Sequence, residues 1–361
     1  MIKTNFEAAF HQVFDDALLC IDSHVAGEPA RLVVGGLPPI SGKTTNDKRL
    51  YLSEKLDDIR LRVTREPRGH RDMFASILVE PESEEAAFGL VYMDARRYPY
   101  LCGHATIAAV SAMIELGMIE ANPPEARVVV DTPSGAWETV AQVRENPHPD
   151  GRRWRVESVA IRPEISFAYL LNQSLQVPGL GSIQVDVSFT GGFFVMVSAE
   201  QIDLDLKVEN APQLAQLGMD IIDAGNAQLE IKHPQRDYIN TIDVVEFYDP
   251  RGHQRKRGKN FVVLGEGHID RSPCGTGTCA KLALLHRRGQ LSVGESFVNE
   301  GSLGTTFDAR IVSVTSIEDS ATGNTIPAIV PEVSGAAHLT GLQHLILTPD
   351  DPFPDGFLLP A

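Results

Sequence analysis

Two stretches of this chain repeat one pattern almost half a chain apart. The first is LCGHATIAAVSAMIELG, which begins at Leu101, and the second is PCGTGTCAKLALLHRRG, which begins at Pro273. Aligned on their Cys-Gly pairs, the stretches match at Cys102 and Cys274, Gly103 and Gly275, Thr106 and Thr278, Ala108 and Ala280, and Gly117 and Gly289. Repetition of this kind indicates an internal duplication, so the 361 residues are expected to form two related halves.

Short β-rich runs alternate with turn residues along most of the chain. Strands are predicted for RLVVGGLP, RLRVTREP, ASILVEP, GLVYMD, ARVVVDTP, SIQVDVSF, FFVMVSA, NFVVLG and ARIVSVT. Each repeated stretch has helical apolar spacing and ends in glycine, so it predicts a helix, and APQLAQLGMDIIDAGNAQL predicts a third, amphipathic one. We expect an α+β fold of two pseudo-symmetric domains, each a β-barrel-like sheet wrapped around a central helix. The first would comprise residues 15–165 plus 337–361, and the second residues 166–336.

Composition narrows the classes of partner. The apolar fraction, 43%, and the charged fraction, 22%, are those of a soluble globular protein. A net charge of −16 repels nucleic-acid phosphates, and no apolar run is long enough to cross a bilayer, so we expect neither nucleic acid nor membrane as a partner. The start, MIKTNFEAAFHQVFDDALL, predicts a short amphipathic helix and not a secretory signal. Four cysteines form no disulfide framework, so a cytoplasmic location is expected.

A Cys-Gly pair at a helix start offers a particular chemistry. The N–H groups of the first turn have no partner inside the helix and bind anions well. A thiol placed there is expected to have a lowered pKa, and the adjacent glycine lets a ligand approach the backbone. If the two halves face each other, one pocket holds two opposed sulfurs and two helix N-termini. Such a pocket suits proton transfer between the two faces of one carbon, with a carboxylate held by the N–H groups.

Other interpretations of these residues fit less well. The segment GEGHIDRSPCGTGT does not match a phosphate-binding GxxxxGK[ST] loop. Cys274 and Cys279 have no second Cys/His pair for zinc, and Cys279 is expected to point into the core. His104 close to Cys102 leaves a cysteine-hydrolase nucleophile open, although one nucleophile does not explain a second Cys-Gly. Lys281, inside the second helix, has no context of a Schiff-base lysine. We expect no metal and no cofactor.

The two Cys-Gly segments resemble the signature segments of the proline racemase family. LCGHATIAA and DRSPCGTGTCAKLALLH carry the strongest likeness, and it continues in IDSHVAGEPARLVVGG, EPRGHRDMF, TGGFF, IKHPQRDYINTIDVVEFYD and LTGLQHL. The family includes proline racemases, 4-hydroxyproline 2-epimerases and trans-3-hydroxyproline dehydratases. The resemblance implies a cofactor-independent enzyme with the two-domain, diaminopimelate epimerase-like fold.

The resemblance also implies roles for individual residues. Cys102 and Cys274 would be the two acid/base thiols. The substrate carboxylate would be held by the backbone N–H groups of Gly103, His104, Gly275 and Thr276, and the ring nitrogen by the side chains of His104 and Asp270. The alternative for Asp270 is a helix cap or turn residue, and for His104 a structural histidine. His24, Glu28 and His70 lie in family motifs, but their spacing assigns them no chemistry, so they are interpreted as structural or as supports of the site.

Several positions bear on the reaction and the substrate. The dehydratases of the family carry Thr where this chain has Cys274, so cysteine at both positions favours racemisation or epimerisation. Phe74 matches an aromatic residue that packs on the substrate ring, whereas Leu264 stands where proline racemases have a second one. Leu264 opens the pocket to a ring hydroxyl without offering a donor. Arg96 and Arg97 stand where the family often has glycines. They are interpreted either as surface residues or as part of the pocket mouth or of a subunit contact.

The sequence therefore predicts an isomerase that inverts Cα of 4-hydroxyproline or proline by a two-cysteine mechanism. Leu264 favours 4-hydroxyproline, and EPRGHRDMF favours proline. The alternatives are a trans-3-hydroxy-L-proline dehydratase, which is a lyase, and a catalytically silent imino-acid binding protein. The expected partner is a small-molecule imino acid. The oligomeric state is left open, with a homodimer as one alternative.

Overall fold

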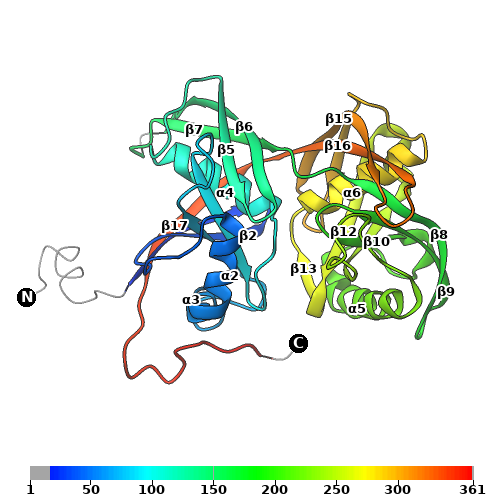
Figure 1. Ribbon diagram of the computed structural model, residues 1–361, viewed down its shortest axis with the longest axis horizontal. Coiled ribbons are helices and arrows are strands. Elements are labelled where there is room, and N and C mark those ends of the chain that lie inside the picture. Colours follow the sequence, from blue (N-terminus) through cyan, green and yellow to red (C-terminus); the bar gives the residue numbers. More distant parts are fainter. Residues whose placement is uncertain (1–16, 149, 360–361) are drawn as a thin grey trace, which may run out of the picture.

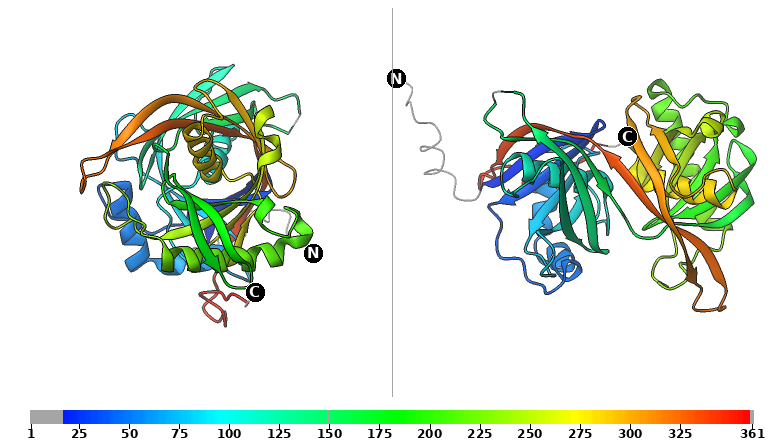
Figure 2. Two further views of the ribbon diagram at one scale, coloured as in Figure 1. Left: turned by 90° about the vertical axis from the view of Figure 1, so that its right-hand side faces the viewer. Right: turned by 90° about the horizontal axis from the view of Figure 1, so that it is seen from above.

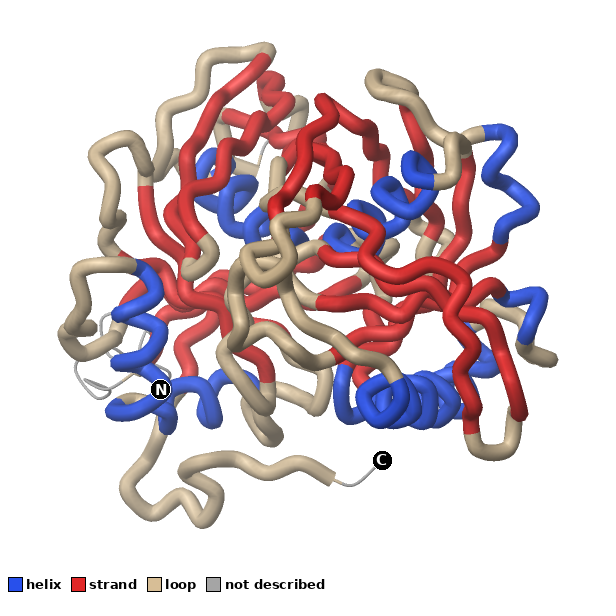
Figure 3. The backbone as a smooth tube through the Cα atoms, turned by 45° about the vertical axis from the view of Figure 1, so that its right-hand side comes forward, coloured by secondary structure: helices blue, strands red, loops and turns tan. Residues whose placement is uncertain are grey.

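The described chain forms two lobes that lie side by side along the long axis of the molecule (Figure 1). The computed structural model describes residues 17–148 and 150–359, apart from the side chain of residue 266. The helix predicted at the N-terminus lies outside these residues. Strands take up more of the described chain than helices do, and the longer helices lie either inside the lobes or on their outer faces (Figure 3).

The first lobe is built around helix α4 (Gly103–Glu115). Every residue of α4 is buried, as expected for a helix that is apolar all round. Strands β1, β2, β7 and β17 contact it directly. The other elements of this lobe are β1 (Leu18–Val25), β2 (Glu28–Gly35), α2 (Thr45–Lys55), α3 (Asp57–Thr64), β3 (Phe74–Val79), β4 (Phe88–Asp94), β5 (Glu125–Thr132), β6 (Gly135–Glu145), β7 (Trp154–Ile161) and β17 (Ala337–Leu345).

The second lobe repeats this plan around helix α6 (Gly275–Arg287). Strands β8, β9, β15 and β16 contact α6, and the amphipathic helix α5 (Ala211–Gln228) buries one face against the core. The strands are β8 (Phe167–Val177), β9 (Gly181–Phe189), β10 (Phe193–Ser198), β11 (Ile242–Asp249), β12 (Arg257–Leu264), β13 (His268–Asp270), β14 (Ser296–Glu300), β15 (Thr306–Glu318) and β16 (Thr325–Gly335). Short 3₁₀ helices are η1 (Ala199–Gln201), η2 (Val208–Asn210), η3 (Pro250–Arg255) and η4 (Gly265–Gly267).

Strand β16 joins the two lobes. It pairs with β15 in the second lobe, and its end, Val333–Gly335, pairs with Val159–Ile161 of β7 in the first. The chain then re-enters the first lobe, where β17 pairs with β1. Viewed along the long axis, α4 and α6 lie one behind the other at the centre (Figure 2). Side chains of both helices share one hydrophobic cluster, so the domain limits near residues 166 and 336 remain a prediction.

The predicted α+β class and the three predicted helices are confirmed. One strand prediction is wrong: most of RLRVTREP lies in helix α3. Ile59 and Val63, one turn apart, are the buried apolar residues of this helix and pack toward the core. Asp57 and Asp58 stabilise the N-terminus of the helix. No helix in the described part of the chain is long and apolar enough to cross a membrane.

Candidate active site

The two Cys-Gly pairs begin the two central helices and meet where the lobes touch. Cys102 is the N-cap residue of α4, and Cys274 is the N-cap residue of α6. A Cβ atom built on Gly103 would lie 3.6 Å from the Cα of Gly275. The helix starts therefore face each other backbone to backbone, which is the condition for one pocket shared by both halves. Both cysteines are buried, with exposed fractions of 7% and 4%.

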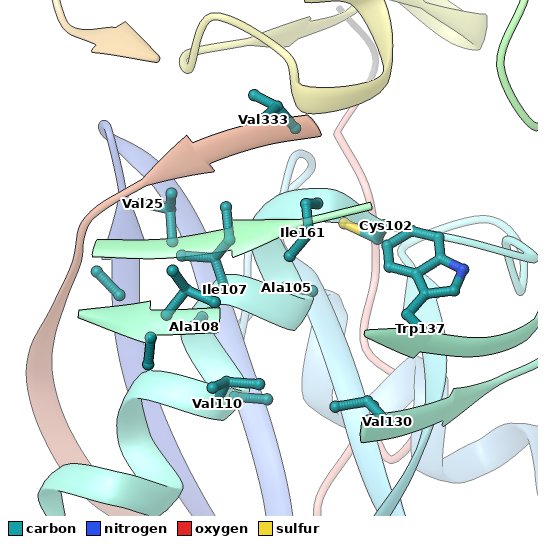
Figure 4. Packing of buried hydrophobic residues seen from close by; sticks show 14 of the residues in the cluster. Val25, Cys102, Ala105, Ile107, Ala108, Val110, Val130, Trp137, Ile161 and Val333 are labelled. Atoms are coloured by element: carbon teal, nitrogen blue, oxygen red, sulfur yellow. The ribbon is translucent and has the colours of Figure 1, made fainter. Parts of the chain in front are cut away.

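On the first lobe, Cys102 lies against a histidine. Its Sγ is 3.2 Å from the Nδ1 atom of His104, and the His104 ring packs edge-on against Phe74 with 4.8 Å between ring centroids. Burial lowers the pKa of His104 to about 4, so the imidazole is neutral. Figure 4 shows Cys102 at the edge of the hydrophobic cluster, beside Trp137 and Ile161. A neutral ring can accept a proton or hydrogen bond at this place.

On the second lobe, Cys274 is held by its own loop. Its Sγ accepts a hydrogen bond from the Gly277 N–H at 3.3 Å and lies 3.6 Å from the Thr276 hydroxyl. Its backbone N–H donates to the Ser272 hydroxyl at 3.0 Å, and that hydroxyl donates to Asp270 at 2.7 Å. The loop therefore links the Cys274 backbone to the Asp270 carboxylate through Ser272. Leu264, at the end of β12, packs in the apolar cluster that contains Cys274.

The expected lowering of the thiol pKa values is wrong for this arrangement. Burial raises the pKa of both Cys102 and Cys274 well above the ordinary value, and the charge of Asp270 raises both further. The N–H groups of the first helical turns act in the opposite direction but are outweighed. Burial between the lobes thus destabilises a thiolate more than the N–H groups of the helix N-terminus stabilise it. Cys279 is fully buried, as predicted for a core residue.

Asp270 is a buried carboxyl group next to both thiols. It lies at the end of β13 with an exposed fraction of 6%. Burial raises its pKa to about 7, and the negative charge of Glu28 contributes to the rise. The hydrogen bonds that it accepts from Ser272 only partly offset this effect. A positive group placed beside Asp270 would favour its ionised form.

Glu28 is the residue of this site whose part the sequence did not reveal. It begins β2 of the first lobe, is 1% exposed, and accepts hydrogen bonds from His268 Nε2 at 3.1 Å and the Arg271 backbone N–H at 2.7 Å. Burial disfavours both charges, but their hydrogen bond holds the pKa of Glu28 below its usual value and that of His268 above it. The Arg271 side chain returns to the first lobe, 2.9 Å from Asp72. Because these partners are distant in the chain, only the motif IDSHVAGEPA pointed to Glu28.

The segment that departs from the family pattern reaches toward the second lobe. The Arg97 side chain is 49% exposed and lies 3.7 Å from Asp243. Arg96 donates to the backbone carbonyl of Arg71 at 3.4 Å. A Cβ atom on Gly191 would overlap the Leu101 side chain, so the segment packs directly on the second lobe. In the described residues no group of three or more His, Cys, Asp or Glu side chains is placed to hold a metal ion.

The sequence of this chain matches those of known proteins along most of its length. The family model described as proline racemase matches residues 20–358. A proline racemase of Clostridioides difficile is 41% identical over 346 residues, which cover 96% of this chain and 99% of that protein. A 4-hydroxyproline 2-epimerase of Streptosporangium roseum is 36% identical over 339 residues, which cover 94% of this chain and 97% of that protein.

A solved structure agrees with the fold over nearly its full length. The crystal structure of a hydroxyproline epimerase from Agrobacterium vitis, with trans-4-hydroxy-L-proline bound, superposes with a TM-score of 0.83 at 29% sequence identity. The match covers 95% of this chain and 96% of that one. With two matching Cys-Gly helix starts and this likeness along the chain, the protein belongs to the proline racemase family and is an isomerase.

Proposed function

We propose that this protein inverts the Cα of 4-hydroxyproline or proline, with Cys102 and Cys274 as the acid and the base. The observation that carries the proposal is the facing pair of helix starts, where Gly103 and Gly275 approach to ordinary contact distance. Each helix has a thiol at its N-cap, so two sulfurs from different lobes border one small region. A substrate carbon between them would have a thiol on each face.

The carboxylate of the substrate would lie between the two helix N-termini. The backbone N–H groups of Gly103, His104, Gly275 and Thr276 belong to the first turns, where helix geometry leaves donors without intrahelical partners. Both helix dipoles point their positive ends at this place. The same donors would stabilise the negative charge that develops when the α-proton leaves.

The ring nitrogen of the substrate would lie beside Asp270 and His104. An imino acid carries a cationic ring nitrogen, and a buried carboxylate is its natural partner. The cation would favour the ionised form of Asp270, whose pKa in the protein alone is raised to about 7 by burial. The neutral His104 ring can accept a second hydrogen bond from the same nitrogen.

The reaction exchanges one proton for another at the same carbon. One thiolate removes the α-proton, and the electrons of the broken C–H bond pass into the carbon and its carboxylate. The opposing thiol then donates its proton to the other face, which leaves the second sulfur as thiolate. The raised pKa of a buried thiol makes its thiolate a stronger base once formed, which suits a weakly acidic α-proton.

Leu264 supports 4-hydroxyproline as the better substrate. Its aliphatic side chain packs against the apolar cluster that contains Cys274, and in place of an aromatic ring it would leave room for a ring hydroxyl. Phe74 and the EPRGHRDMF segment support proline. A panel of L-proline, trans-4-hydroxy-L-proline and trans-3-hydroxy-L-proline, followed by NMR in D₂O, distinguishes the substrates. Dehydration of the 3-hydroxy compound would instead mark a lyase, and no deuterium at any Cα would mark a binding protein.

The test of the mechanism is serine at each thiol in turn. We expect Cys102→Ser and Cys274→Ser each to lower the rate of epimerisation by roughly 10²- to 10⁴-fold, because each removes one of the two acid/base groups. Cys279→Ser, a change at a fully buried cysteine that is not an N-cap, serves as the control and should alter stability more than rate. Full activity in either single N-cap variant would refute the two-thiol mechanism.

A further inference from the structure

A buried ion pair lies behind Cys274. Lys281 of α6 and Glu246 of β11 have side chains that are 1% and 0% exposed, and Lys281 Nζ is 2.7 Å from Glu246 Oε1. Lys281 also donates to Asn299 Oδ1 at 3.0 Å. Burying two charges is costly unless further hydrogen bonds satisfy them, so a pair at this depth calls for a reason beyond stability.

The hydrogen bonds of this pair converge on the residue that precedes Cys274. Asn260 donates both to Glu246 Oε1 at 3.2 Å and to the Pro273 carbonyl at 2.8 Å. Asn299 and the Thr278 hydroxyl donate to the same carbonyl at 3.3 and 3.1 Å. The Pro273 carbonyl thus accepts from three side chains, two of which belong to residues bonded to the ion pair.

The network holds Cys274 in an unusual backbone conformation. Cys274 has φ 59° and ψ 109°, whereas Cys102, its counterpart in the first lobe, is extended with φ −156°. A non-glycine residue at positive φ costs about 1–3 kcal/mol and persists only where surrounding contacts fix it. The bonds to Pro273 on one side and to Ser272 on the other supply that fixation.

The second oxygen of Glu246 lies on the same side of Gly277 as the Cys274 sulfur. Among the described residues no hydrogen-bond partner is found for Glu246 Oε2, although it is buried. A Cβ atom on Gly277 would lie 2.6 Å from this oxygen and 3.1 Å from Cys274 Sγ. Glycine at position 277 is therefore what allows carboxylate and sulfur to share one small space.

In the described residues, Cys102 has different surroundings: the buried carboxylate that acts on it is Glu28, which is paired with His268 of the other lobe. Ala109 occupies the position that matches Lys281, and Ala105 the position that matches Gly277. The Thr106 hydroxyl is paired with the buried Tyr92 hydroxyl at 2.7 Å, which is a neutral contact. The duplication therefore preserved the thiols but not their surroundings.

We infer that the Glu246–Lys281 pair is a positioning device dedicated to Cys274, which makes the two thiols chemically unequal. The pair fixes the Pro273–Cys274 backbone through Asn260 and Asn299 and places the Glu246 carboxylate near Cys274. This inference rests on the proposed function for its effect on turnover, but the inequality of the thiols can be measured without any substrate.

The experiment compares the alkylation of the two thiols in one molecule. Wild type and Glu246→Gln are treated with iodoacetamide across a range of pH, and the ratio of Cys274 to Cys102 labelling is read by peptide mass spectrometry. Because both thiols lie between the same lobes, the ratio cancels any change in lobe opening. Removing the negative charge of Glu246 favours the thiolate form of Cys274. The ratio of Cys274 to Cys102 labelling should therefore rise roughly tenfold at pH values below the thiol pKa. Turnover should fall roughly 10- to 100-fold with little change in KM, because the sulfur is no longer held in place.

A second variant covers the case in which an unpaired Lys281 prevents folding. Glu246→Gln with Lys281→Met leaves no buried charge, and its labelling ratio should rise in the same direction by a smaller factor. The matched control is Glu115→Gln, which removes a buried, ion-paired carboxylate at the far end of α4 and should leave the ratio unchanged.

The outcomes separate the two proposals. A ratio equal to that of wild type in both Glu246 variants, or one that changes equally in Glu115→Gln, overturns the inference while leaving the two-thiol mechanism intact. Full activity of Cys274→Ser overturns the mechanism but not the measured inequality of the thiols.

Discussion

At the scale of single residues, Asp270 is the group whose charge decides whether the proposed site can hold a cation. It is buried beside both thiols, and burial together with the charge of Glu28 raises its pKa to about 7. The same burial keeps His104 neutral. The carboxyl group that we propose as the partner of a substrate ammonium thus titrates close to neutrality, where its protonation state changes with small changes of pH.

The pH dependence of turnover should report this carboxyl group. As pH falls through about 7, Asp270 gains a proton and ceases to attract a cation, so kcat/KM of the wild type should decline on the acid side. In Asp270→Asn this decline should disappear, and kcat/KM at alkaline pH should drop roughly 10- to 100-fold, since a hydrogen bond to a charged group is lost. The profile of kcat/KM against pH, recorded for the wild type and for Asp270→Asn, measures both the acid-side decline and the drop at alkaline pH. An acid limb that persists unchanged in Asp270→Asn would show that another group titrates.

The residues of the site could be predicted from sequence only where the chemistry is local. Cys102 and Cys274 emerged from the repeated Cys-Gly pattern, and the backbone donors followed from their place at helix starts. Glu28 and Glu246 did not, because their partners lie far away in the chain and meet them only in the folded protein. The direction of the thiol pKa shifts cannot be predicted from the helix starts either, because burial between the lobes outweighs the effect of the helix N–H groups.

At the scale of elements, the two central helices are defined by sequence more firmly than the segments around them. Their helical apolar spacing and final glycines predict a central helix in each lobe, and every residue of α4 is buried. RLRVTREP alternates like a strand, but the helix that contains most of it begins earlier, with Asp57 and Asp58 in its first turn and Ile59 buried one turn before Val63. A short segment can fit both the helical and the strand spacing of apolar residues, and only its packing against the sheet decides which structure forms.

Gly103→Ala tests the close approach of the two helices. The new Cβ would lie 3.0 Å from the Ile161 side chain and 3.6 Å from the Gly275 Cα, so the methyl group would occupy the space between the helix starts. We expect a stability loss of about 1–3 kcal/mol from overpacking and a strong rise in KM, because the carboxylate site is narrowed. Thermal unfolding and steady-state kinetics measure the two effects.

Gly341→Ala in β17 provides the comparison for this change. Its Cβ would meet nothing closer than the Gln343 side chain at 3.9 Å, so KM should stay at the wild-type value. If Gly103→Ala bound substrate as well as Gly341→Ala does, the helix starts would not form the carboxylate site.

At the scale of the whole molecule, the site exists only while the lobes touch. Strand β16 joins them covalently and by pairing, but the residues that could contact a substrate are divided between the lobes. Polar contacts beside the thiols hold the lobes together: Glu28 of the first lobe binds the segment at His268 and Arg271, and the Arg271 side chain binds Asp72. Because both thiols are buried, we expect a substrate that reaches them to loosen these contacts.

Arg271→Ala should let the lobes separate more often without unfolding either core. It removes the ion pair with Asp72, whose side chains are 33% and 18% exposed, but keeps the backbone N–H that binds Glu28. A partly exposed ion pair contributes about 1 kcal/mol, so the lobe contact should weaken roughly fivefold. The alkylation rates of Cys102 and Cys274 should rise together by this factor. Cys20 and Cys279, both fully buried in hydrophobic clusters, should stay unreactive and so report on the cores. Equal rises at all four cysteines would mean general loosening, and no rise at Cys102 and Cys274 would mean that Arg271 does not limit separation of the lobes.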